Sequence, residues 1–372
     1  MRKDWEYKKW ADVLTIINGK NQKAVESIDG TYPIYGSGGI MGYANDWLCP
    51  ENCTIIGRKG NINKPIFVES KFWNVDTAFG LNSNQNLLAS KYLYYFCLNY
   101  DFNRHNKAVT IPSLTKVDLL KIEMPLPPKP TQLAIVAELD KINELIQLKK
   151  QQLKDYDQLA QSIFYEMFGD PVENEKGWEV KKLGEMCSAI TKGTTPTSIG
   201  FNFEKEGVNF VKVEAFGSND RVDKEKLSFI SEECHQNMLR SQLKENDILI
   251  CIAGATVGKL SIVDFSILPA NTNQACAIVR VKDKQVIFYS YLYGYLKYSY
   301  IQLVVNNLKK GVAQPNLSLG QIRDFNIKVP PLPLQQQFAA RIEAIERQKQ
   351  QVSETIKDLE TLLASRMQYW FD

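Results

Sequence analysis

Histidine is scarce in this sequence, and long apolar runs are missing. The 372 residues include only His105 and His235, which stand far apart. Neither has metal-ligand spacing or an evident nucleophile partner, which argues against a zinc site or a histidine-based triad. No stretch of 18 apolar residues occurs, and residues 1–10 are charged, unlike a secretory signal. We therefore expect a cytoplasmic protein with no membrane span.

An excess of charge of one sign is also lacking. The chain has 45 basic and 42 acidic residues, a formal net charge of +3, so any phosphate contacts must come from local clusters. Its seven cysteines are an odd number, and the pair Cys49 and Cys53 has no second pair at zinc-ligand spacing. We interpret the cysteines as free thiols of a reducing compartment.

The motifs of enzymes that act on nucleotides or DNA are missing too. Residues 254–259 (GATVGK) resemble a phosphate-binding loop, but only three residues separate the glycines, and Leu260 follows the lysine where Ser or Thr is needed. There is no Asn-Pro-Pro-aromatic run of the kind that adenine-N6 methyltransferases use, and no nuclease-type acidic cluster. We expect a chain without a catalytic site and without a metal or cofactor of its own.

What the sequence does contain is two copies of one unit. Residues 5–9 (WEYKK) return as residues 178–182 (WEVKK), a shift of 173 positions. Residues 127–132 (PPKPTQ) return as residues 330–335 (PPLPLQ), a shift of 203, so the second copy holds 30 additional residues. This duplication predicts two similar globular parts, each followed by a proline-rich turn and a more regular segment.

The regular segment of each copy has the heptad pattern of a long helix that pairs with another helix. Lys149 and Arg366 interrupt the pattern; they either fix the register or extend their charged ends into solvent. The two seams share one register. Their apolar members are Leu139, Ile142, Ile146, Leu153, Tyr156 and Ile163 in the first copy, and Ile342, Ile345, Val352, Ile356, Leu359 and Leu363 in the second.

Prolines and a glycine mark the ends of the first helix. The proline-rich residues 127–130 keep the chain extended, Thr131 is expected to cap the helix N-terminus, and Gly169 to end the helix. The sequence thus predicts four segments: a first globular domain at 1–126, a spacer helix at 127–170, a second globular domain at 171–329 and a second spacer helix at 330–372.

Each globular part contains a buried strand that leads into a glycine turn. Residues 53–57 (CTIIG) precede residues 58–64 (RKGNINK), and residues 247–252 (DILICI) precede residues 254–259. Glycine lets a phosphate approach the backbone closely, and a lysine adds positive charge, which favours an anion site. An ordinary hairpin turn with a surface lysine explains the second turn equally well.

Basic and amide-rich segments occupy equivalent positions later in each copy, at 104–107 (RHNK) and 306–314 (NNLKKGVAQ). Lys and Arg hold phosphates, whereas Asn and Gln pair with adenine edges; a solvated loop is the alternative interpretation. The nearby aromatic clusters at 92–96 and 289–300 are predicted to pack in the core rather than stack on bases. The candidate DNA contacts are Tyr35, Ser37, Arg58, Lys59, Asn61, Lys64, Arg104 and Lys107 in the first copy, and Thr194, Thr195, Thr256, Lys259, Lys309, Lys310, Gln314 and Asn316 in the second.

The order and duplication of these motifs resemble the specificity subunit of type I restriction–modification systems, over essentially the whole chain. The first copy departs from the pattern with RKGN at 58–61 and TIP at 110–112, which fits halves that read different half-sites. The matching stretches are WEVKKLGE at 178–185, GATVGK at 254–259, QPNLS at 314–318, PPLPLQQQ at 330–337 and FYEMFGDP at 164–171.

The resemblance implies an α+β fold with two mixed α/β target-recognition domains, separated by two long helices that pair as an antiparallel coiled coil. It implies recognition of double-stranded DNA at a bipartite, asymmetric site and docking of two adenine-N6 methyltransferase (modification) subunits. Restriction subunits would complete the complex, with S-adenosylmethionine, ATP and Mg bound in the partner subunits and none in this chain. The alternative is a non-catalytic coiled-coil scaffold whose two heads bind ligands other than DNA.

Overall fold

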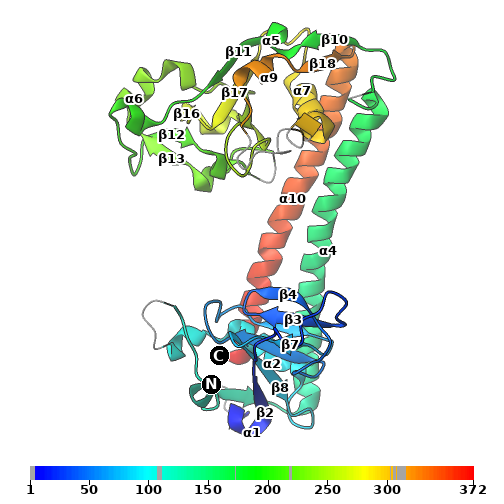
Figure 1. Cartoon of the computed structure of the whole chain (residues 1–372), viewed down its shortest axis with the longest axis vertical. Coiled ribbons are helices and arrows are strands. Elements are labelled where there is room, and N and C mark those ends of the chain that lie inside the picture. The colour runs from blue at the N-terminus through cyan, green and yellow to red at the C-terminus, as the bar shows by residue number, and fades with distance from the viewer. Residues whose placement is uncertain are drawn as a thin grey trace. The chain divides into compact units, whose positions relative to one another are not determined.

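The computed structural model describes residues 5–106, 111–171, 173–217, 220–301, 303–304, 307 and 316–372. The chain divides into two compact units. The first unit comprises Met1–Lys150 and Glu354–Asp372, and the second comprises Gln151–Ser353. Two long helices, α4 (Lys129–Phe168) and α10 (Leu332–Phe371), each contribute residues to both units (Figure 1).

The first unit is built on small sheets with strand orders β1-β9, β2-β8-β5-β6 and β4-β3-β7. Its short helices are α1 (Trp10–Val13), α2 (Ser90–Asn99), η1 (Phe102–His105) and α3 (Lys116–Leu119). Its strands are β1 (Glu6–Lys9), β2 (Leu14–Asn18), β3 (Tyr32–Gly36), β4 (Gly39–Ala44), β5 (Cys53–Gly57), β6 (Ile66–Val68), β7 (Trp73–Asn74), β8 (Ala78–Ser83) and β9 (Glu123–Leu126).

The second unit has sheets with strand orders β10-β18, β11-β17-β14-β15 and β13-β12-β16. Its strands are β10 (Glu179–Lys182), β11 (Cys187–Lys192), β12 (Val208–Val211), β13 (Ser228–Ile230), β14 (Ile248–Cys251), β15 (Leu260–Ile262), β16 (Ala270–Thr272), β17 (Cys276–Val281) and β18 (Asn326–Val329). Its short helices are α5 (Leu183–Met186), η2 (Pro196–Ile199), η3 (Val213–Ala215), η4 (Lys224–Lys226), α6 (Glu232–Asn237), η5 (Leu239–Ser241), η6 (Phe265–Ile267), α7 (Tyr289–Tyr295), η7 (Leu296–Tyr300) and α9 (Leu319–Arg323).

The strand orders of the two units correspond one to one, which confirms the duplication predicted from the sequence. Even the exceptions agree, because β3 pairs parallel with β7 as β12 does with β16, and the other pairs are antiparallel. Much of the additional length of the second copy lies between β12 and β13. Residues 212–227 separate these strands, whereas only Ser37 and Gly38 separate β3 from β4.

The long helices pair antiparallel in each unit, as expected. In the first unit, Lys150 bonds to Glu360 at 2.8 Å and Glu138 bonds to Arg366. The residue numbers therefore increase in opposite directions along α4 and α10. In the second unit the Lys349 ammonium lies 2.9 Å from Asp157. The fold class is therefore two α/β parts with a pair of long antiparallel helices.

The heptad positions are buried or half-buried, and those near the helix ends pack against the cores of the units: Leu139 and Leu363 in the first unit, Ile163 and Ile342 in the second. Leu139, Ile142, Ile146, Ile345, Val352 and Ile356 are buried, and Leu153, Tyr156, Ile163, Ile342, Leu359 and Leu363 are half-buried.

The predicted N-cap of the first helix was wrong. Thr131 lies inside the first turn of α4 rather than at its N-cap, and its amide donates to the Pro128 carbonyl at 2.9 Å. The reason is that proline is compatible with a first helical turn, so Pro130 does not delay the helix. The predicted end is confirmed, because α4 stops at Phe168 and Gly169 adopts a left-handed φ of +77°.

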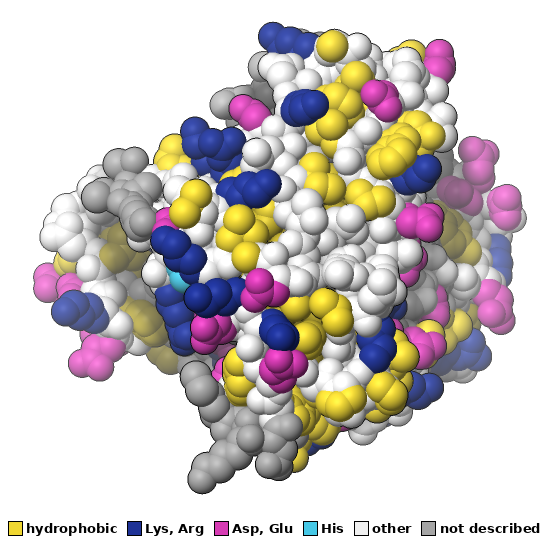
Figure 2. Space-filling model, turned by 90° about the horizontal axis from the view of Figure 1, so that it is seen from below, with side chains coloured by type: hydrophobic (Ala, Val, Ile, Leu, Met, Phe, Trp, Pro, Cys, Tyr) yellow, Lys and Arg dark blue, Asp and Glu magenta, His cyan; other side chains and the backbone are white. Residues whose placement is uncertain are grey.

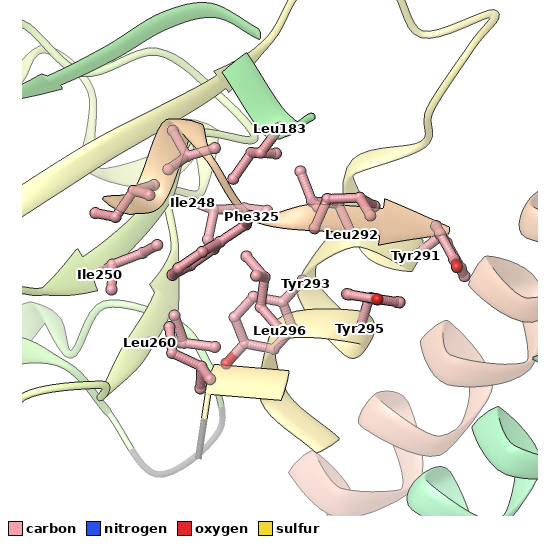
Figure 3. Packing of buried hydrophobic residues seen from close by; sticks show 14 of the residues in the cluster. Leu183, Ile248, Ile250, Leu260, Tyr291, Leu292, Tyr293, Tyr295, Leu296 and Phe325 are labelled. Carbon is pink, nitrogen blue, oxygen red and sulfur yellow. The ribbon is translucent and has the colours of Figure 1, made fainter. Parts of the chain in front are cut away.

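Each unit has an apolar core in which aromatic side chains from its own helix pack on its sheet. In the second unit, Leu292 and Leu296 face Phe325 and the β14 residues Ile248 and Ile250, whereas Tyr291 and Tyr295 of α7 lie on the opposite side (Figure 3). There their rings pack against Phe164, and their hydroxyls donate to the Lys328 and Asn326 carbonyls of β18. Tyr92 and Tyr95 are buried in the same way in the first unit. The core interpretation of the aromatic clusters is thus confirmed for these tyrosines, and all seven cysteines are free, as predicted.

Candidate nucleic-acid interface

In the first unit, the glycine turn after β5 is held against the segment that precedes α3. The Leu114 amide donates to the Arg58 carbonyl at 2.9 Å, and the Gly60 amide donates to the Pro112 carbonyl at 3.0 Å. Lys59 and Ser113 form an isolated bridge between the two segments. Two stretches about fifty residues apart in the sequence therefore form one surface, with the side chains of Arg58 and Lys59 exposed on it.

The second unit repeats this arrangement. The Leu317 amide donates to the Ile252 carbonyl at 2.9 Å, and Ala253 forms the bridge with Asn316. By these contacts, Gly254 corresponds to Gly60. Both have a left-handed backbone, with φ of +93° and +80°, which glycine adopts without strain. The two motifs that the sequence singled out in each copy are thus neighbours in space in both units.

A second turn completes the surface of the first unit. A Cβ atom on Gly60 would lie 3.9 Å from the Ser37 hydroxyl, and one on Gly38 would lie 3.7 Å from the Asn61 amide nitrogen. The β3–β4 turn therefore lies beside the turn after β5. Tyr35, also a candidate contact, is half-buried with its ring edge-on to Phe72, and burial raises the pKa of its hydroxyl.

Arg104 is joined to the same region through η1. Asn63, one position before the exposed Lys64, accepts a hydrogen bond from the Phe102 amide at 2.8 Å and donates to Asp101 at 2.9 Å. Hydrogen bonds from Asn63 and Asn103 lower the pKa of Asp101. The Arg104 guanidinium, 5.8 Å from the Tyr100 ring centroid, is exposed. The structure therefore brings Ser37, Arg58, Lys59, Asn61, Lys64 and Arg104 into one region of the first unit.

In the second unit the lysine of the glycine turn is directed elsewhere. The Lys259 ammonium donates to the Phe216 carbonyl at 2.6 Å. The amides of Gly258 and Lys259 bond to the carbonyls of Cys251 and Thr256, as in an ordinary tight turn. This favours the hairpin interpretation of residues 254–259 over a phosphate cradle. Ala255 and Thr256 are exposed, as is Asn316.

Thr194 and Thr195 follow β11 and are half-buried. The Thr194 amide donates to the Thr272 carbonyl at 3.1 Å, and the Thr195 hydroxyl bonds to Gln274. These contacts join them to the β16–β17 connection. The candidates Lys107, Lys309, Lys310 and Gln314 lie outside the described residues.

The sequence did not indicate the residues that fix these segments. The Asn106 side chain accepts a hydrogen bond from the Ser113 amide at 3.0 Å, and the Asn63 side chain bonds to Asp101 and Phe102 at the start of η1. Asparagine side chains that bond to nearby backbone are common in turns, so an asparagine in a turn does not by itself indicate such a role. The only indication in the sequence was that these two residues lie beside basic residues. Gln274 could not have been identified, since its partner Thr195 is 79 positions away.

Positive and negative side chains are mixed on the face of the molecule that Figure 2 shows, where Lys and Arg are interspersed with Asp and Glu, in line with the net charge of +3. Among the described residues, no group of three or more His, Cys, Asp or Glu side chains could hold a metal ion. Within that same part of the chain, every helix is too short or too polar to cross a membrane.

Comparison with known proteins identifies similar chains. The family model of the type I restriction modification DNA specificity domain matches residues 2–155 and 175–361. The type I restriction enzyme MjaIX specificity subunit of Methanocaldococcus jannaschii is 25% identical over 279 residues, which cover 69% of this chain and 62% of that protein. A putative type I restriction enzyme specificity subunit of Haemophilus influenzae is 24% identical over 94% of this chain and 89% of its own length. The crystal structure of the type I restriction–modification S subunit from M. genitalium has a TM-score of 0.58 at 15% identity and covers 100% of this chain and 98% of that one, so the fold is shared.

Proposed function

Because the chain belongs to the family of type I restriction modification DNA specificity domains, we propose that it reads the DNA sequence for a type I restriction–modification complex. Each unit recognises one half of a split site in double-stranded DNA. The observation that carries this proposal is the duplicated surface, in which a glycine turn and a later polar segment are held together by the same backbone contacts in both units.

The chemistry of the first surface suits a duplex. The exposed cations Arg58, Lys59, Lys64 and Arg104 supply phosphate contacts, which give affinity without sequence information. Asn61 can donate to and accept from a base edge, and bidentate pairing of an amide with adenine is a common specific contact.

The two surfaces are built alike but carry different side chains. Where the first unit has Lys59 and Asn61, the second has the small, uncharged Ala253 and Ala255. Unlike surfaces read unlike half-sites, so the recognised site is asymmetric. We assign the second half-site to Thr256, Asn316, Thr194 and Thr195. From the sequence alone we add Lys309, Lys310 and Gln314, which lie outside the described residues.

The chemistry of the complex resides in its partners. Modification subunits bring S-adenosylmethionine and methylate adenine N6, and restriction subunits bring ATP and Mg. Helices α4 and α10 are related by one shift of 203 positions, so they present equivalent surfaces to two copies of one modification subunit.

Methylome sequencing tests the proposal. A host without other type I systems, expressing the chain with its modification subunit, is expected to carry N6-methyladenine on opposite strands of one split, asymmetric motif. Asn61→Ala should relax the sequence preference at one half of that motif only. Thr256→Ala, an exposed polar position in the corresponding turn of the second unit, should affect the other half. Absence of any motif, together with salt-insensitive DNA binding, would favour a scaffold whose heads bind other ligands.

A further inference from the structure

The β3–β4 hairpin of the first unit exposes two adjacent aliphatic side chains. Ile40 is 56% exposed and Met41 is 60% exposed, although both lie in a strand. Strand β4 is the edge of its sheet, and only Ser37 and Gly38 connect it to β3. Side chains of a strand alternate between faces, so two consecutive exposed apolar residues require a local cause.

That cause is a β-bulge at Met41. Ile34 pairs with Gly42 and Tyr35 pairs with Ile40, so Met41 has no residue opposite it in the register. A bulge interrupts the alternation and re-aims a side chain. Met41 lies across the hairpin, since a Cβ atom on Gly36 would come within 2.7 Å of its sulfur. The preceding strand is anchored by Tyr35, which packs on Phe72.

The surroundings of this pair are those of the candidate interface. The hairpin turn lies beside Asn61, and the exposed cations Arg58 and Lys59 precede that residue. The Glu26 carboxylate lies against Gly42, which is beyond Met41 from the turn. The cationic end of the hairpin is therefore its turn, and an apolar tip flanked by cations matches a duplex, whose base pairs lie between phosphate rows.

We propose that Ile40 and Met41 form an apolar wedge that inserts between two base pairs of the first half-site and kinks the duplex there. The proposal rests on the proposed function and adds that the exposed side chains of the hairpin contact the DNA bases. Aliphatic side chains inserted at a base step unstack it and bend DNA, and the bent duplex contacts more protein surface. Arg58 and Lys59 hold the phosphates beside the opened step.

The kink is confined to one half-site. In the second unit, residues 212–227 take the place of the two-residue turn, so β12 and β13 form no tight hairpin. Sequence preference at the opened step follows from its ease of deformation, which is greatest for pyrimidine–purine steps.

The test uses the complex with its modification subunits and a duplex that carries the mapped motif. End-to-end fluorescence transfer measures the bend, and 2-aminopurine at successive positions of the first half-site reports unstacking. The wild-type complex should bend the duplex and brighten 2-aminopurine at one step. The double variant Ile40→Ala/Met41→Ala should abolish both signals and weaken binding roughly 10-fold. Ile40→Leu/Met41→Leu should retain them, and so should Leu87→Ala, an exposed control outside the hairpin.

Each other outcome overturns the wedge. A wild-type complex that methylates the motif without bending or unstacking DNA refutes the wedge and leaves the proposed function intact. A bend that persists in the alanine variant does the same. If the alanine variant instead changes the sedimentation behaviour of the free chain and leaves DNA signals unchanged, the hairpin docks a protein. The first of these outcomes is measured on the wild-type complex alone, so the proposal can be refuted even if a variant folds poorly.

Discussion

Two glutamines at equivalent positions join the long helices to the two units. Gln132 is fully buried; its oxygen accepts the Ala89 amide at 2.8 Å, and its nitrogen donates to the carbonyls of Leu87 and Pro127 at 2.9 Å. Gln335, 203 positions later, makes the same three kinds of bond to Phe288, Val286 and Pro330. The repeated glutamine thus satisfies backbone groups where α2 and α7 begin and fixes the start of each long helix.

Replacing either glutamine should therefore be costly. Gln132→Ala leaves the buried Ala89 amide and Pro127 carbonyl without this partner, and each such loss costs about 1–3 kcal/mol; the carbonyl of the exposed Leu87 can bond to water instead. We expect urea unfolding to show a loss of roughly 3 kcal/mol in the stability of the first unit. Gln151→Ala, at an exposed position of α4, is the control. A change below about 0.5 kcal/mol in Gln132→Ala would show that the network is not needed.

Lys59 offers a separate prediction, on DNA binding. If its ammonium holds one phosphate, Lys59→Ala should weaken binding to all sequences alike and reduce the slope of log affinity against log salt by about 0.9. Fluorescence anisotropy of the complex between 50 and 200 mM salt, roughly the usual range, measures this slope. Lys284→Ala, an exposed lysine of the second unit, should leave it unchanged. An altered methylation motif in Lys59→Ala would instead assign Lys59 to base reading.

Residue-level roles were the hardest to predict from the sequence. Lys259 ends a glycine turn for which an anion site and an ordinary hairpin turn were equally good interpretations, and its ammonium is bound to the Phe216 carbonyl, 43 positions away. No local pattern contains that contact, because it depends on the residues inserted between β12 and β13. The sequence showed Gln132 and Gln335 as part of a repeated motif, but it did not predict that their side chains bond to backbone groups.

At the scale of elements, a buried cation joins the long helices in the second unit. The Lys349 side chain is 7% exposed and lies 2.9 Å from Asp157 of α4 and 3.0 Å from Glu346. Burial alone would lower the pKa of Lys349, but the hydrogen bonds to these acids raise it. Burial raises the pKa of Glu346, so this carboxylate depends on Lys349 to stay charged.

Removing the cation should destabilise the helix pair. Lys349→Met leaves the half-buried Glu346 carboxylate without this partner. Breaking a fully buried pair costs roughly 3–5 kcal/mol, so for this partly exposed acid we expect a loss of about 2 kcal/mol. Because a buried acid with a raised pKa binds its proton more tightly when folded, the loss should be larger at pH 8 than at pH 5, roughly. Lys150→Ala, which breaks the exposed pair with Glu360, should cost less than about 1 kcal/mol. Equal losses at both pH values would contradict this role of Glu346.

The first unit uses a different contact at the helix pair. Glu138 of α4 bonds to the Arg366 guanidinium and accepts the Trp370 indole N–H at 3.1 Å. These contacts, the Arg366 bond first, lower the pKa of Glu138 below its ordinary value of 4.5. Arg366, which interrupts the seam, therefore has a partner on the facing helix.

The lowered pKa of Glu138 makes the stability of the first unit depend on pH. A lowered folded pKa gives stability that is present above the ordinary pKa and lost as the pH falls through the folded pKa. Glu138→Gln should therefore flatten the fall in unfolding free energy that the first unit shows below about pH 4.5, as measured by urea titrations at each pH. A Glu138→Gln profile parallel to the wild type would rule out this linkage.

Elements with strong periodicity were predicted well. The heptads of α4 and α10 and the apolar run of β5 are local patterns, and each appears where the sequence placed it. Short strands such as β1 were not predicted, because β1 pairs with β9 more than a hundred positions away and its sequence is mostly charged. Such pairings depend on how the whole unit closes.

At the scale of the whole molecule, each unit is completed by the far end of a long helix. Phe371, near the end of α10, packs on Tyr92 and Phe96 of the first unit, with ring centroids 5.1 and 5.8 Å apart. Phe168, at the end of α4, packs on Tyr291 and Phe338 of the second unit at 4.6 and 5.3 Å. These phenylalanines are 203 positions apart, so the duplication extends to the way in which each core is closed.

Because of this arrangement, a substitution near the end of a long helix should destabilise the unit against which that end packs, rather than the unit that it follows in the sequence. Phe371→Ala should lower the stability of the first unit by about 3–5 kcal/mol, although residue 371 follows the entire second unit in sequence. Phe168→Ala, although it follows the first domain, should destabilise the second unit by a similar amount. Hydrogen exchange followed by mass spectrometry resolves the two cases, because peptides from β2, β5 and β8 should lose protection in Phe371→Ala only, and peptides from β11, β14 and β17 in Phe168→Ala only. If either substitution opened both sets of strands equally, the units would unfold as one, and the same coupling would carry a change in one recognition surface to the other; selective opening means that the two half-sites can be altered separately.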